Sequence, residues 1–572
     1  EIDIYLGGIK MKYVIVGGVA GGASSAARLR RLDEKAEIIM FEKGPHVSFS
    51  NCCLPYRLSE KIGKTESLVL MNPLQFAKQY NIQARTSSEV LSIDRDLKKV
   101  KVRNLENGQE YEETYDKLIL SPGGNAIVPP IKGIENANTF IVKNVVDIAK
   151  LYHFLKENNV KKVSVLGGGF IGVEVAENLI EAGYEVSLVE AMPQILRTYD
   201  YDMVQILHKE TLDKGVQLIV GDKTVEFKDS NMILASGKVV EGEAVVMAVG
   251  VASDSFLAKQ AGLDLNARGA IKVDANYRTS DPDIYAVGDA IEVYNALTHK
   301  PFQLALAGPA QKQARAAADH IYGRPVRNSG YIGSSCIKVF DYNAASTGLT
   351  AAQCEAEGIS YDIAYVIPQD KVGIMPESYP LHYKLIYEVP TGKVLGAQAI
   401  SKGDAAKRID IVATLLKFGG TVDDLRDLEL CYAPPFSTAK DAGNYAGLVA
   451  GNLLQKTYRQ VRVDEVRGLV ESNAYIIDVR EEHEFAKGHL KTAVNIPLSQ
   501  IRNRLDEIPT DRPVYLHCRS AQRSYNATLA LQGHGFQNIY NISGSFLGIC
   551  LYEYYNDVVQ NREPIVTAYN FN

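Results

Sequence analysis

The sequence lacks long hydrophobic runs, an excess of basic residues and a dense set of cysteines. No apolar run approaches the roughly 18 residues that suggest a bilayer span, so we expect no membrane anchor. With 62 Lys and Arg against 68 Asp and Glu, the chain shows no basic footprint for nucleic acid. Seven cysteines, an odd number, argue against a disulfide framework and for a reducing compartment, so we expect a cytoplasmic protein. No Cys/His set has zinc-like spacing, and we predict no metal site.

The length of 572 residues is about four times that of a typical domain and predicts several domains, each with its own core. The ten residues before Met11 carry no signal-peptide pattern. We expect them to be a short extension that takes no part in the fold.

Near the N-terminus, an apolar strand at 13–16 runs into GGVAGGASSAARLRRL, and a second strand at 38–41 ends before an acid. A strand, a glycine turn, a helix and a following acid are typical of a dinucleotide-binding unit, with pyrophosphate at the helix N-terminus and the carboxylate on a ribose hydroxyl. Against G-x-G-x-x-G, Gly17 and Gly22 fit, Val19 replaces the middle glycine, and Gly21 is extra. The candidate cofactor-binding residues here are Gly17, Gly18, Ala20, Gly21, Gly22 and Glu42.

A second unit follows at KKVSVLGGGFIGVEVAENL, where Gly167, Gly169 and Gly172 match the pattern fully and VSLVE ends in Glu190. Two such units predict two bound dinucleotides. The Glu190 carboxylate would accept a hydrogen bond from a free 2′-hydroxyl and repel a 2′-phosphate, which favours NADH over NADPH.

Two later segments, LILSPGG at 118–124 and TSDPDIYAVGDA at 279–290, resemble those of the two-dinucleotide disulfide reductase flavoproteins. The resemblance implies that Asp289 binds the ribityl chain of FAD. The segment LALAGPAQKQAR, at 304–315, is similar to the helix whose N-terminus points at the flavin ring. The FAD contacts implied in these segments are Ser121, Pro122, Gly123, Gly288, Asp289, Ala307 and Gly308.

The stretch SFSNCCLPY, at 48–56, places two adjacent cysteines after the first unit. The C-x4-C spacing of dithiol reductases is missing here, and a disulfide between neighbours closes a strained ring, so we predict a single redox thiol, Cys52. Ser50 or Asn51 as a cap and Pro55 in the first turn predict a helix that places Cys52 at its positive end, where the thiol pKa is lowered. For Cys53 we expect a buried structural role.

The motif S-F-x-N-C-x-L-P-Y, together with CYAPPFS at 431–437, is similar to that of coenzyme A disulfide reductases and NADH-dependent coenzyme A persulfide reductases over about residues 11–450. The resemblance implies a mixed disulfide between Cys52 and coenzyme A. It also implies a homodimer in which Tyr432 of the partner subunit donates a proton to the departing thiolate. Tyr379 matches a second family tyrosine, although its segment ESYPLHYK departs from the tandem-tyrosine pattern.

Coenzyme A contacts follow from the same resemblance and from helical spacing. Family members hold a coenzyme A phosphate with a cation at the Arg31 position, and Arg28 lies three residues earlier on the same helix face. Ser48 and Asn51 are implied to line the pantetheine route.

From residue 461, apolar strands alternate with amphipathic segments in a pattern similar to rhodanese domains. A strand ends at His517, and Cys518 opens a loop whose backbone N–H groups and arginines would stabilise a thiolate or persulfide. The predicted loop residues are Arg519, Ser520, Arg523 and Ser524. A cysteine phosphatase loop, C-x5-R, fits less well because the arginine comes one place early, and an inactive binding module is a further alternative. We expect structural roles for Cys336, Cys354, Cys431 and Cys550.

The predicted fold class is α/β, with FAD and NAD Rossmann-like domains, an α+β dimerisation domain and a fused α/β rhodanese domain. The expected bounds are 11–125 and 255–325 for FAD, 126–254 for NAD, 326–450 for dimerisation, 451–460 for a linker and 461–567 for rhodanese. We predict an NADH-dependent FAD enzyme that reduces coenzyme A disulfide, or coenzyme A persulfide and polysulfide. The alternatives are an NADH peroxidase or oxidase that cycles a Cys52 sulfenic acid, and a redox-sensing scaffold without turnover.

Overall fold

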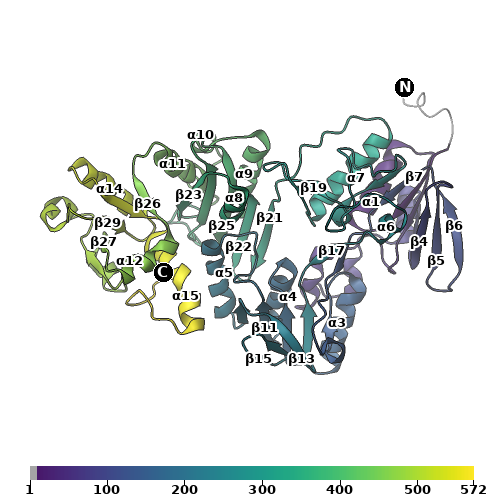
Figure 1. Cartoon of the computed structure of the whole chain (residues 1–572), viewed down its shortest axis with the longest axis horizontal. Coiled ribbons are helices and arrows are strands. Elements are labelled where there is room, and N and C mark those ends of the chain that lie inside the picture. Colours follow the sequence, from purple (N-terminus) through teal and green to yellow (C-terminus); the bar gives the residue numbers. More distant parts are fainter. Residues whose placement is uncertain (1–9, 572) are drawn as a thin grey trace. The chain divides into compact units, whose positions relative to one another are not determined.

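The computed structural model describes residues 10–571, which form two compact units (Figure 1). Unit 1 consists of residues up to 191 and residues 222–331, and unit 2 consists of residues 192–221 and 332 onward. Most of the predicted N-terminal extension, residues 1–9, lies outside the described residues. Within residues 10–571, no helix is both long and apolar enough to cross a membrane.

The first part of unit 1 is a parallel sheet in the order β18-β7-β1-β2-β3. Apart from the edge strand β3, its strands are mostly apolar and buried, as expected for a sheet covered on both sides. Their bounds are Lys12–Val16 (β1), Glu37–Phe41 (β2), Gln83–Arg85 (β3), Lys117–Leu120 (β7) and Ile284–Ala286 (β18). Helices α1 (Ala20–Leu32) and α7 (Ala307–Ile321) pack against each other, and α2 spans Pro73–Tyr80.

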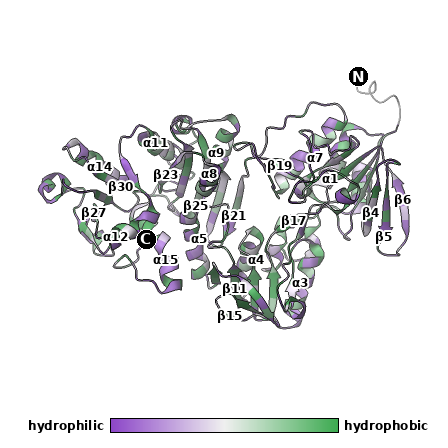
Figure 2. Cartoon of the chain, viewed as in Figure 1, coloured by the Kyte–Doolittle hydropathy of each residue, from purple (hydrophilic) through white to green (hydrophobic). Residues whose placement is uncertain are grey.

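Smaller elements complete this part. The antiparallel strands β4 (Ser88–Asp94), β5 (Lys99–Asn104) and β6 (Glu110–Thr114) form a separate sheet, whose edge strand β6 is largely hydrophilic (Figure 2). Two short pairs are β8 (Gly124–Ala126) with β17 (Val251–Ser253), and β19 (Val293–Tyr294) with β20 (Pro301–Phe302). Helix α6 spans Phe256–Gln260.

The second part of unit 1 repeats the parallel arrangement, with neighbouring strands β11-β10-β16-β9. These strands span Glu185–Glu190, Lys162–Leu166, Ala244–Met247 and Thr139–Phe140, and helices α3 and α4 span Val145–Glu157 and Phe170–Glu181. Strands β13 (Thr224–Lys228), β14 (Asn231–Leu234) and β15 (Val239–Val240) form an antiparallel sheet. The segment 192–221, which is part of unit 2, contains α5 (Tyr201–Asp213) and β12 (Gln217–Val220).

Unit 2 begins with an antiparallel sheet in the order β21-β22-β25-β24-β23. The strands span Ser335–Val339 (β21), Tyr342–Gly348 (β22), Tyr361–Val366 (β23), His382–Glu388 (β24) and Val394–Ser401 (β25), and β24 and β25 form the hairpin that the sequence predicts. Helices are α8 (Ala351–Glu357), α9 (Ala406–Phe418), α10 (Val422–Asp427) and α11 (Ala442–Leu454). Helices α9 and α11 pack on this sheet. The sheet also carries buried polar residues, His382, Lys384 and Gln398.

The rest of unit 2 is a parallel sheet in the order β26-β30-β29-β27-β28. Its strands span Arg459–Val461 (β26), Tyr475–Asp478 (β27), Ala493–Asn495 (β28), Val514–His517 (β29) and Ile539–Ile542 (β30). Its helices are α12 (Val466–Glu471), α13 (Glu482–Phe485), α14 (Gln522–Gly533) and α15 (Ser545–Gln560). The predicted linker at 451–460 is corrected: α11 continues to Leu454 and β26 starts at Arg459, so that only residues 455–458 connect them.

Candidate active site

The two glycine turns of unit 1 have the same construction. Glu42 Oε2 accepts a hydrogen bond of 2.8 Å from the Gly18 N–H, and Glu190 Oε2 accepts one of 2.7 Å from the Gly168 N–H. Each helix approaches its turn so closely that a side chain at the last glycine would collide with backbone: a Cβ on Gly22 would lie 1.7 Å from the Gly17 oxygen, and a Cβ on Gly172 would lie 1.9 Å from the Gly167 oxygen. Both turns therefore need glycine where the sequence pattern places it.

The backbone around these turns leaves room for a ligand. Among the described residues, no atom lies within 4 Å of the Cβ position of Gly123, Gly169 or Gly308, so that a pyrophosphate or ring can approach the chain directly. Asp289 lies in a 3-10 turn at Gly288–Ala290, and burial raises the pKa of its carboxyl. Gln313 of α7 accepts the Gly288 N–H at 2.7 Å, which ties this turn to the helix. The residues present fit FAD and a second dinucleotide.

Hydrogen bonds attach the cysteine stretch, residues 48–56, to the first glycine turn and to Leu68. The Ser48 N–H donates to the Gly18 oxygen at 2.8 Å, and the Ser50 N–H donates to the Leu68 oxygen at 2.9 Å. Cys52 lies in a 3-10 turn, Asn51–Cys53, in which Cys53 and Leu54 donate to the carbonyls three residues earlier. Cys52 is exposed and follows Ser48, the residue that is bonded to the glycine turn, by four positions.

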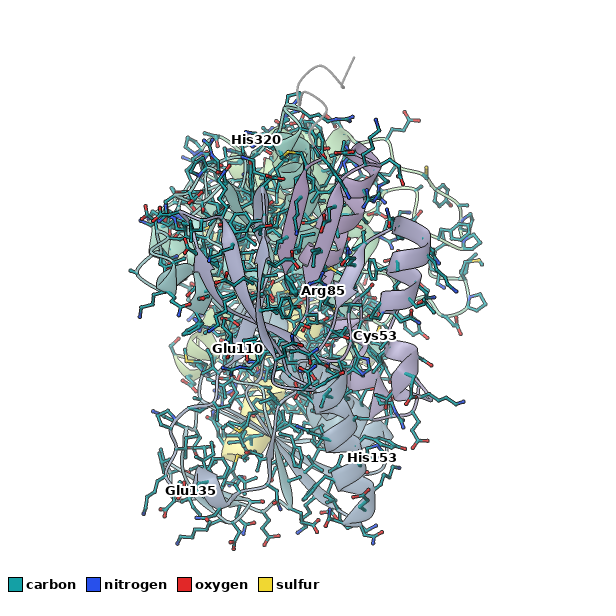
Figure 3. The ribbon with its side chains drawn as sticks, turned by 90° about the vertical axis from the view of Figure 1, so that its right-hand side faces the viewer. Cys53, Arg85, Glu110, Glu135, His153 and His320 are labelled. Carbon is teal, nitrogen blue, oxygen red and sulfur yellow. The ribbon has the colours of Figure 1, made fainter. Side chains whose placement is uncertain are left out.

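The predicted α-helix at Cys52 is wrong. An α-helix would need the N–H of residue 55 to bond the Asn51 oxygen, but Pro55 has no N–H, so the turn closes with i to i+3 bonds and a second 3-10 turn follows at Pro55–Arg57. Ser50 makes no side-chain capping bond. Cys53, which is labelled in Figure 3, is half-buried, where we expected a buried residue.

The pKa of Cys52 is shifted opposite to the predicted direction. The protein packed around the thiol raises its pKa, and the carboxylate of Glu174 on α4 raises it further. Glu174 is itself half-buried, and desolvation together with Glu177 raises the pKa of Glu174 to about 7. The sequence motif does not mark Glu174, because only the packing of α4 on the 3-10 turn at 55–57 brings it close to the cysteine stretch.

Removing the Glu174 charge is expected to activate Cys52. In Glu174→Gln, the repulsion between carboxylate and thiolate is lost, the pKa of Cys52 falls, and the rate of alkylation by iodoacetamide near pH 8 rises about threefold. The measurement follows the Cys52 peptide by mass spectrometry in protein reduced beforehand. Glu181→Gln, on the same helix but paired with Lys61, is the control and leaves the rate unchanged. Equal rates in wild type and Glu174→Gln contradict the prediction.

The two predicted phosphate-binding arginines have different surroundings. Arg28 forms an ion pair with Asp319 of α7, and its side chain is 12% exposed. Its guanidinium is therefore engaged in joining α1 to α7, which corrects its assignment to coenzyme A. Arg31 is exposed on the last turn of α1 and is free to meet a solvent-borne phosphate.

The two predicted tyrosines belong to unit 2. Tyr432 lies on an irregular segment and is 49% exposed. Tyr379 is half-buried, and its backbone pairs with Asp370: the Tyr379 N–H donates to Asp370 Oδ1 at 2.7 Å, and the Asp370 N–H donates to the Tyr379 oxygen at 2.9 Å. Of the four cysteines expected to be structural, Cys354 and Cys550 are buried, whereas Cys336 and Cys431 are exposed.

The loop after β29 carries the second candidate thiol. Cys518 is 1% exposed, Ser524 Oγ lies 3.7 Å from its Sγ, and Ser545 Oγ accepts the Cys518 N–H at 3.2 Å. Arg523 makes two hydrogen bonds of 2.7 and 2.8 Å to Glu484, whose pKa they lower to about 2, and the Cys518 thiol also contributes to raising the pKa of Arg523. Arg519 has one buried nitrogen, Nη1, that lacks a hydrogen-bond partner among the described residues.

A group of buried charged residues lies next to His517, the residue that precedes this loop. Arg480 and Asp478 form an ion pair whose side chains are 1% and 0% exposed, and the Arg480 guanidinium lies 4.0 Å from the ring centre of Phe546. His517 Nε2 lies 3.7 Å from Asp478 Oδ2. The sequence pattern predicted no role for Asp478 or Arg480.

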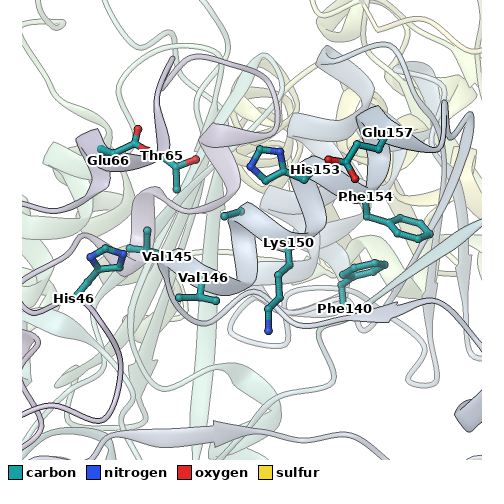
Figure 4. A pocket seen from close by; sticks show the side chains of 11 residues that line it. His46, Thr65, Glu66, Phe140, Val145, Val146, Lys150, His153, Phe154 and Glu157 are labelled. Atoms are coloured by element: carbon teal, nitrogen blue, oxygen red, sulfur yellow. The ribbon is translucent and has the colours of Figure 1, made fainter. Parts of the chain in front are cut away.

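Unit 1 contains a cavity of about 710 Å³ (Figure 4). It is lined by His46, Thr65 and Glu66 and by residues of β9 and α3, including Lys150 and His153. None of the predicted site residues lines it, so we do not assign the chemistry to this cavity.

Comparison with known families agrees with this geometry. Residues 11–314 match the family model described as pyridine nucleotide-disulphide oxidoreductase, and residues 334–442 match the dimerisation domain of the same family. The chain is a pyridine nucleotide-disulphide oxidoreductase. Residues 462–551 match the rhodanese-like domain, so this oxidoreductase carries a C-terminal rhodanese domain, as the sequence predicted.

Individual proteins of this family show which members the chain is similar to. It is 34% identical to the coenzyme A disulfide reductase of Staphylococcus epidermidis over 445 residues, which cover 77% of this chain and 99% of the relative. The crystal structure of reduced Bacillus anthracis CoADR-RHD has a TM-score of 0.92 and 40% identity, covering 96% of this chain and 99% of that one. A NAD-dependent persulfide reductase from A. fulgidus has a TM-score of 0.89 and 32% identity, covering 94% and 99%.

Proposed function

We propose that the protein is an NADH-dependent FAD enzyme that reduces coenzyme A disulfide, or coenzyme A persulfide and polysulfide, through the single thiol of Cys52. The observation that carries the proposal is the exposed Cys52 in a stretch that the Ser48–Gly18 hydrogen bond joins to the first glycine turn. The similarity to the coenzyme A disulfide and persulfide reductases supports the substrate class.

Different residues of the chain would bind FAD, NADH and coenzyme A. The turn at Gly17–Gly22 with Glu42, Asp289 and the start of α7 would hold FAD, and the turn at Gly167–Gly172 with Glu190 would hold NADH. Bound FAD would accept a hydride from NADH and supply the two electrons that reduce a disulfide. Arg31 would hold a coenzyme A phosphate, with Ser48 and Asn51 along the pantetheine chain.

Cys52 would act as the nucleophile toward coenzyme A disulfide. Its thiolate attacks one sulfur, a Cys52–coenzyme A disulfide forms, and the first coenzyme A leaves as a thiolate that takes a proton. Two electrons and a second proton then release the other coenzyme A thiol and restore Cys52. With coenzyme A persulfide, the fragment released is hydrosulfide.

The rhodanese domain would carry sulfur on Cys518. The thiolate attacks the outer sulfur of a donor such as thiosulfate, the donor S–S bond breaks, sulfite leaves, and Cys518 persulfide remains. Backbone N–H groups and Arg519 at the loop would stabilise this anion. Cys518 would pass sulfur to, or receive it from, the coenzyme A site.

We expect a cytoplasmic homodimer in which Tyr432 serves the partner's thiol site. Large apolar side chains of the dimerisation domain are exposed in the single chain: Ile374 is 93%, Phe418 79%, Phe436 71% and Tyr432 49% exposed. Such surface favours burial in an interface. Sedimentation equilibrium is expected to give twice the mass of the chain, and Phe418→Asp to shift the mass toward the monomer. A wild-type monomer at micromolar concentration contradicts the expectation.

One assay tests the function as a whole. Consumption of NADH is followed with coenzyme A persulfide, coenzyme A disulfide, hydrogen peroxide or no acceptor, and NADPH is compared with NADH. Turnover is expected with the coenzyme A substrates and NADH. Rapid turnover with peroxide alone favours a peroxidase or oxidase, and no turnover with any acceptor favours a scaffold.

A further inference from the structure

A buried tyrosine and a buried histidine lie on one face of the dimerisation sheet. Tyr365 of β23 pairs with Lys384 of β24, and His382 lies two residues before Lys384, so all three point to the same face. Tyr365 Oη and His382 Nδ1 are 2.7 Å apart and hydrogen-bonded, and the residues are 6% and 3% exposed. This pair belongs to the reductase part of the chain.

The start of α15 in the rhodanese domain lies directly on the Tyr365 ring. A Cβ built on Gly544 would lie 2.7 Å from Tyr365 Cε1, and one built on Gly548 would lie 3.4 Å from the same atom. Because both glycines lack side chains, the helix backbone itself contacts the ring. The position of Tyr365 therefore sets how closely α15 can approach the sheet.

The first turn of α15 also holds the loop of Cys518. Ser545 Oγ accepts the Cys518 N–H at 3.2 Å, and the Phe546 N–H donates to the Cys518 oxygen at 3.0 Å. The Leu547 N–H donates to the Arg519 oxygen at 3.1 Å. Three hydrogen bonds thus transmit the position of α15 to the two residues that begin the sulfur-binding loop.

His382 is also electrostatically coupled to Arg519 of the same loop. Burial, together with the charge of Arg519, lowers the pKa of His382 to about 3, so the imidazole is neutral at physiological pH. A neutral imidazole adds no positive charge to the loop, and Nη1 of Arg519, which has no hydrogen-bond partner among the described residues, is available to an anionic sulfur. The other ionisable groups that act on Arg519 are Arg480, Glu484, Arg523 and Cys550.

We propose that Tyr365 and His382 are positioning residues for the Cys518 loop, so that the sulfurtransferase site is completed by a domain other than the one that carries its thiol. The inference rests on the proposed sulfur-carrier role of Cys518. It adds that the antiparallel sheet of the dimerisation domain holds the Cys518 loop in the conformation that transfers sulfur.

The test uses full-length variants and the transfer of sulfur from thiosulfate to cyanide. In Tyr365→Phe the ring still supports α15, but His382 loses its partner; in His382→Leu the imidazole is lost and the Tyr365 hydroxyl is left unpaired. We expect kcat/KM to fall about tenfold in each, since a buried polar group is left unpaired. His382→Asn keeps a polar atom near the Nδ1 position and should recover part of the loss.

A matched control is available on α15 itself. Tyr555 donates to the Leu218 oxygen at 3.0 Å, so Tyr555→Phe also removes one buried hydroxyl bond of this helix, but more than two turns beyond the Cys518 loop. We expect near wild-type sulfur transfer in Tyr555→Phe and unchanged NADH-dependent turnover in every variant.

The outcomes separate the proposal from its premise. An inactive wild type refutes sulfur transfer by Cys518 itself. An active wild type with unchanged Tyr365→Phe and His382→Leu overturns the positioning role, as does an equal loss in Tyr555→Phe or an His382→Asn variant no better than His382→Leu. If His382→Leu does not fold, Tyr365→Phe with its control decides.

Discussion

Cys52→Ser is expected to lose NADH-dependent reduction of coenzyme A disulfide by about three orders of magnitude or more, because a hydroxyl cannot form the mixed disulfide that the proposed cycle requires. Serine is nearly the size of cysteine, and position 52 is exposed, so the fold and the dinucleotide sites should be preserved. The measurement is NADH consumption at saturating coenzyme A disulfide, with the flavin spectrum recorded to show that FAD is still bound.

Cys53→Ser is the control for this result, since it changes the neighbouring thiol in the same turn. It should keep most of the activity, because only Cys52 is assigned the nucleophilic role. If Cys53→Ser were as inactive as Cys52→Ser, the two thiols would act as a pair and the single-thiol mechanism would be wrong. A wild-type rate of coenzyme A disulfide reduction in Cys52→Ser would refute the proposal.

Cys518→Ser is expected to abolish sulfur transfer from thiosulfate to cyanide, with a loss of about a thousandfold, and to leave NADH-dependent reduction of coenzyme A disulfide unchanged. The reason is that the loop after β29 carries the thiol on which the persulfide forms, whereas the disulfide chemistry belongs to Cys52. Both activities are measured on the same preparation, so a folding defect would be recognised by a drop in both.

Cys336→Ser is the matched control for the second prediction, because Cys336 is exposed in the same unit and has no assigned chemistry. It should retain both activities. Retention of sulfur transfer in Cys518→Ser would assign the persulfide to another thiol. Loss of coenzyme A disulfide reduction in Cys518→Ser would instead show that the two reactions are coupled in each turnover.

The parts of the fold that depend on local patterns were predictable from the sequence. Gly22 and Gly172 mark both dinucleotide turns, since only glycine fits where the helix meets the strand, and the Pro-Thr-Gly turn marks the hairpin of β24 and β25. Each of these features depends on a few residues that are close together in the sequence. They can therefore be predicted without knowledge of the tertiary packing. The rhodanese loop after His517 follows from the same kind of local signal.

The electrostatics of the site could not be predicted in this way. The helix predicted at Cys52 is limited to a 3-10 turn because Pro55 has no N–H to donate to the Asn51 oxygen. The raised pKa of Cys52 depends on Glu174, more than 100 residues later in the chain, and Arg28 is engaged by Asp319, still further away. Packing between residues far apart in the sequence sets the pKa of Cys52 and the ion pair of Arg28, and no sequence motif predicts that packing.

The four-residue connection between α11 and β26 has a consequence for how the chain can be divided. Helix α15 covers buried groups outside its own domain: Tyr555 meets the ring of His208 at 4.7 Å between centroids, and Gly544 and Gly548 cover Tyr365. A truncation before residue 459 would expose these surfaces to water. The reductase without its C-terminal domain should therefore be prone to aggregation, so the chain is better studied by point substitution than by deletion.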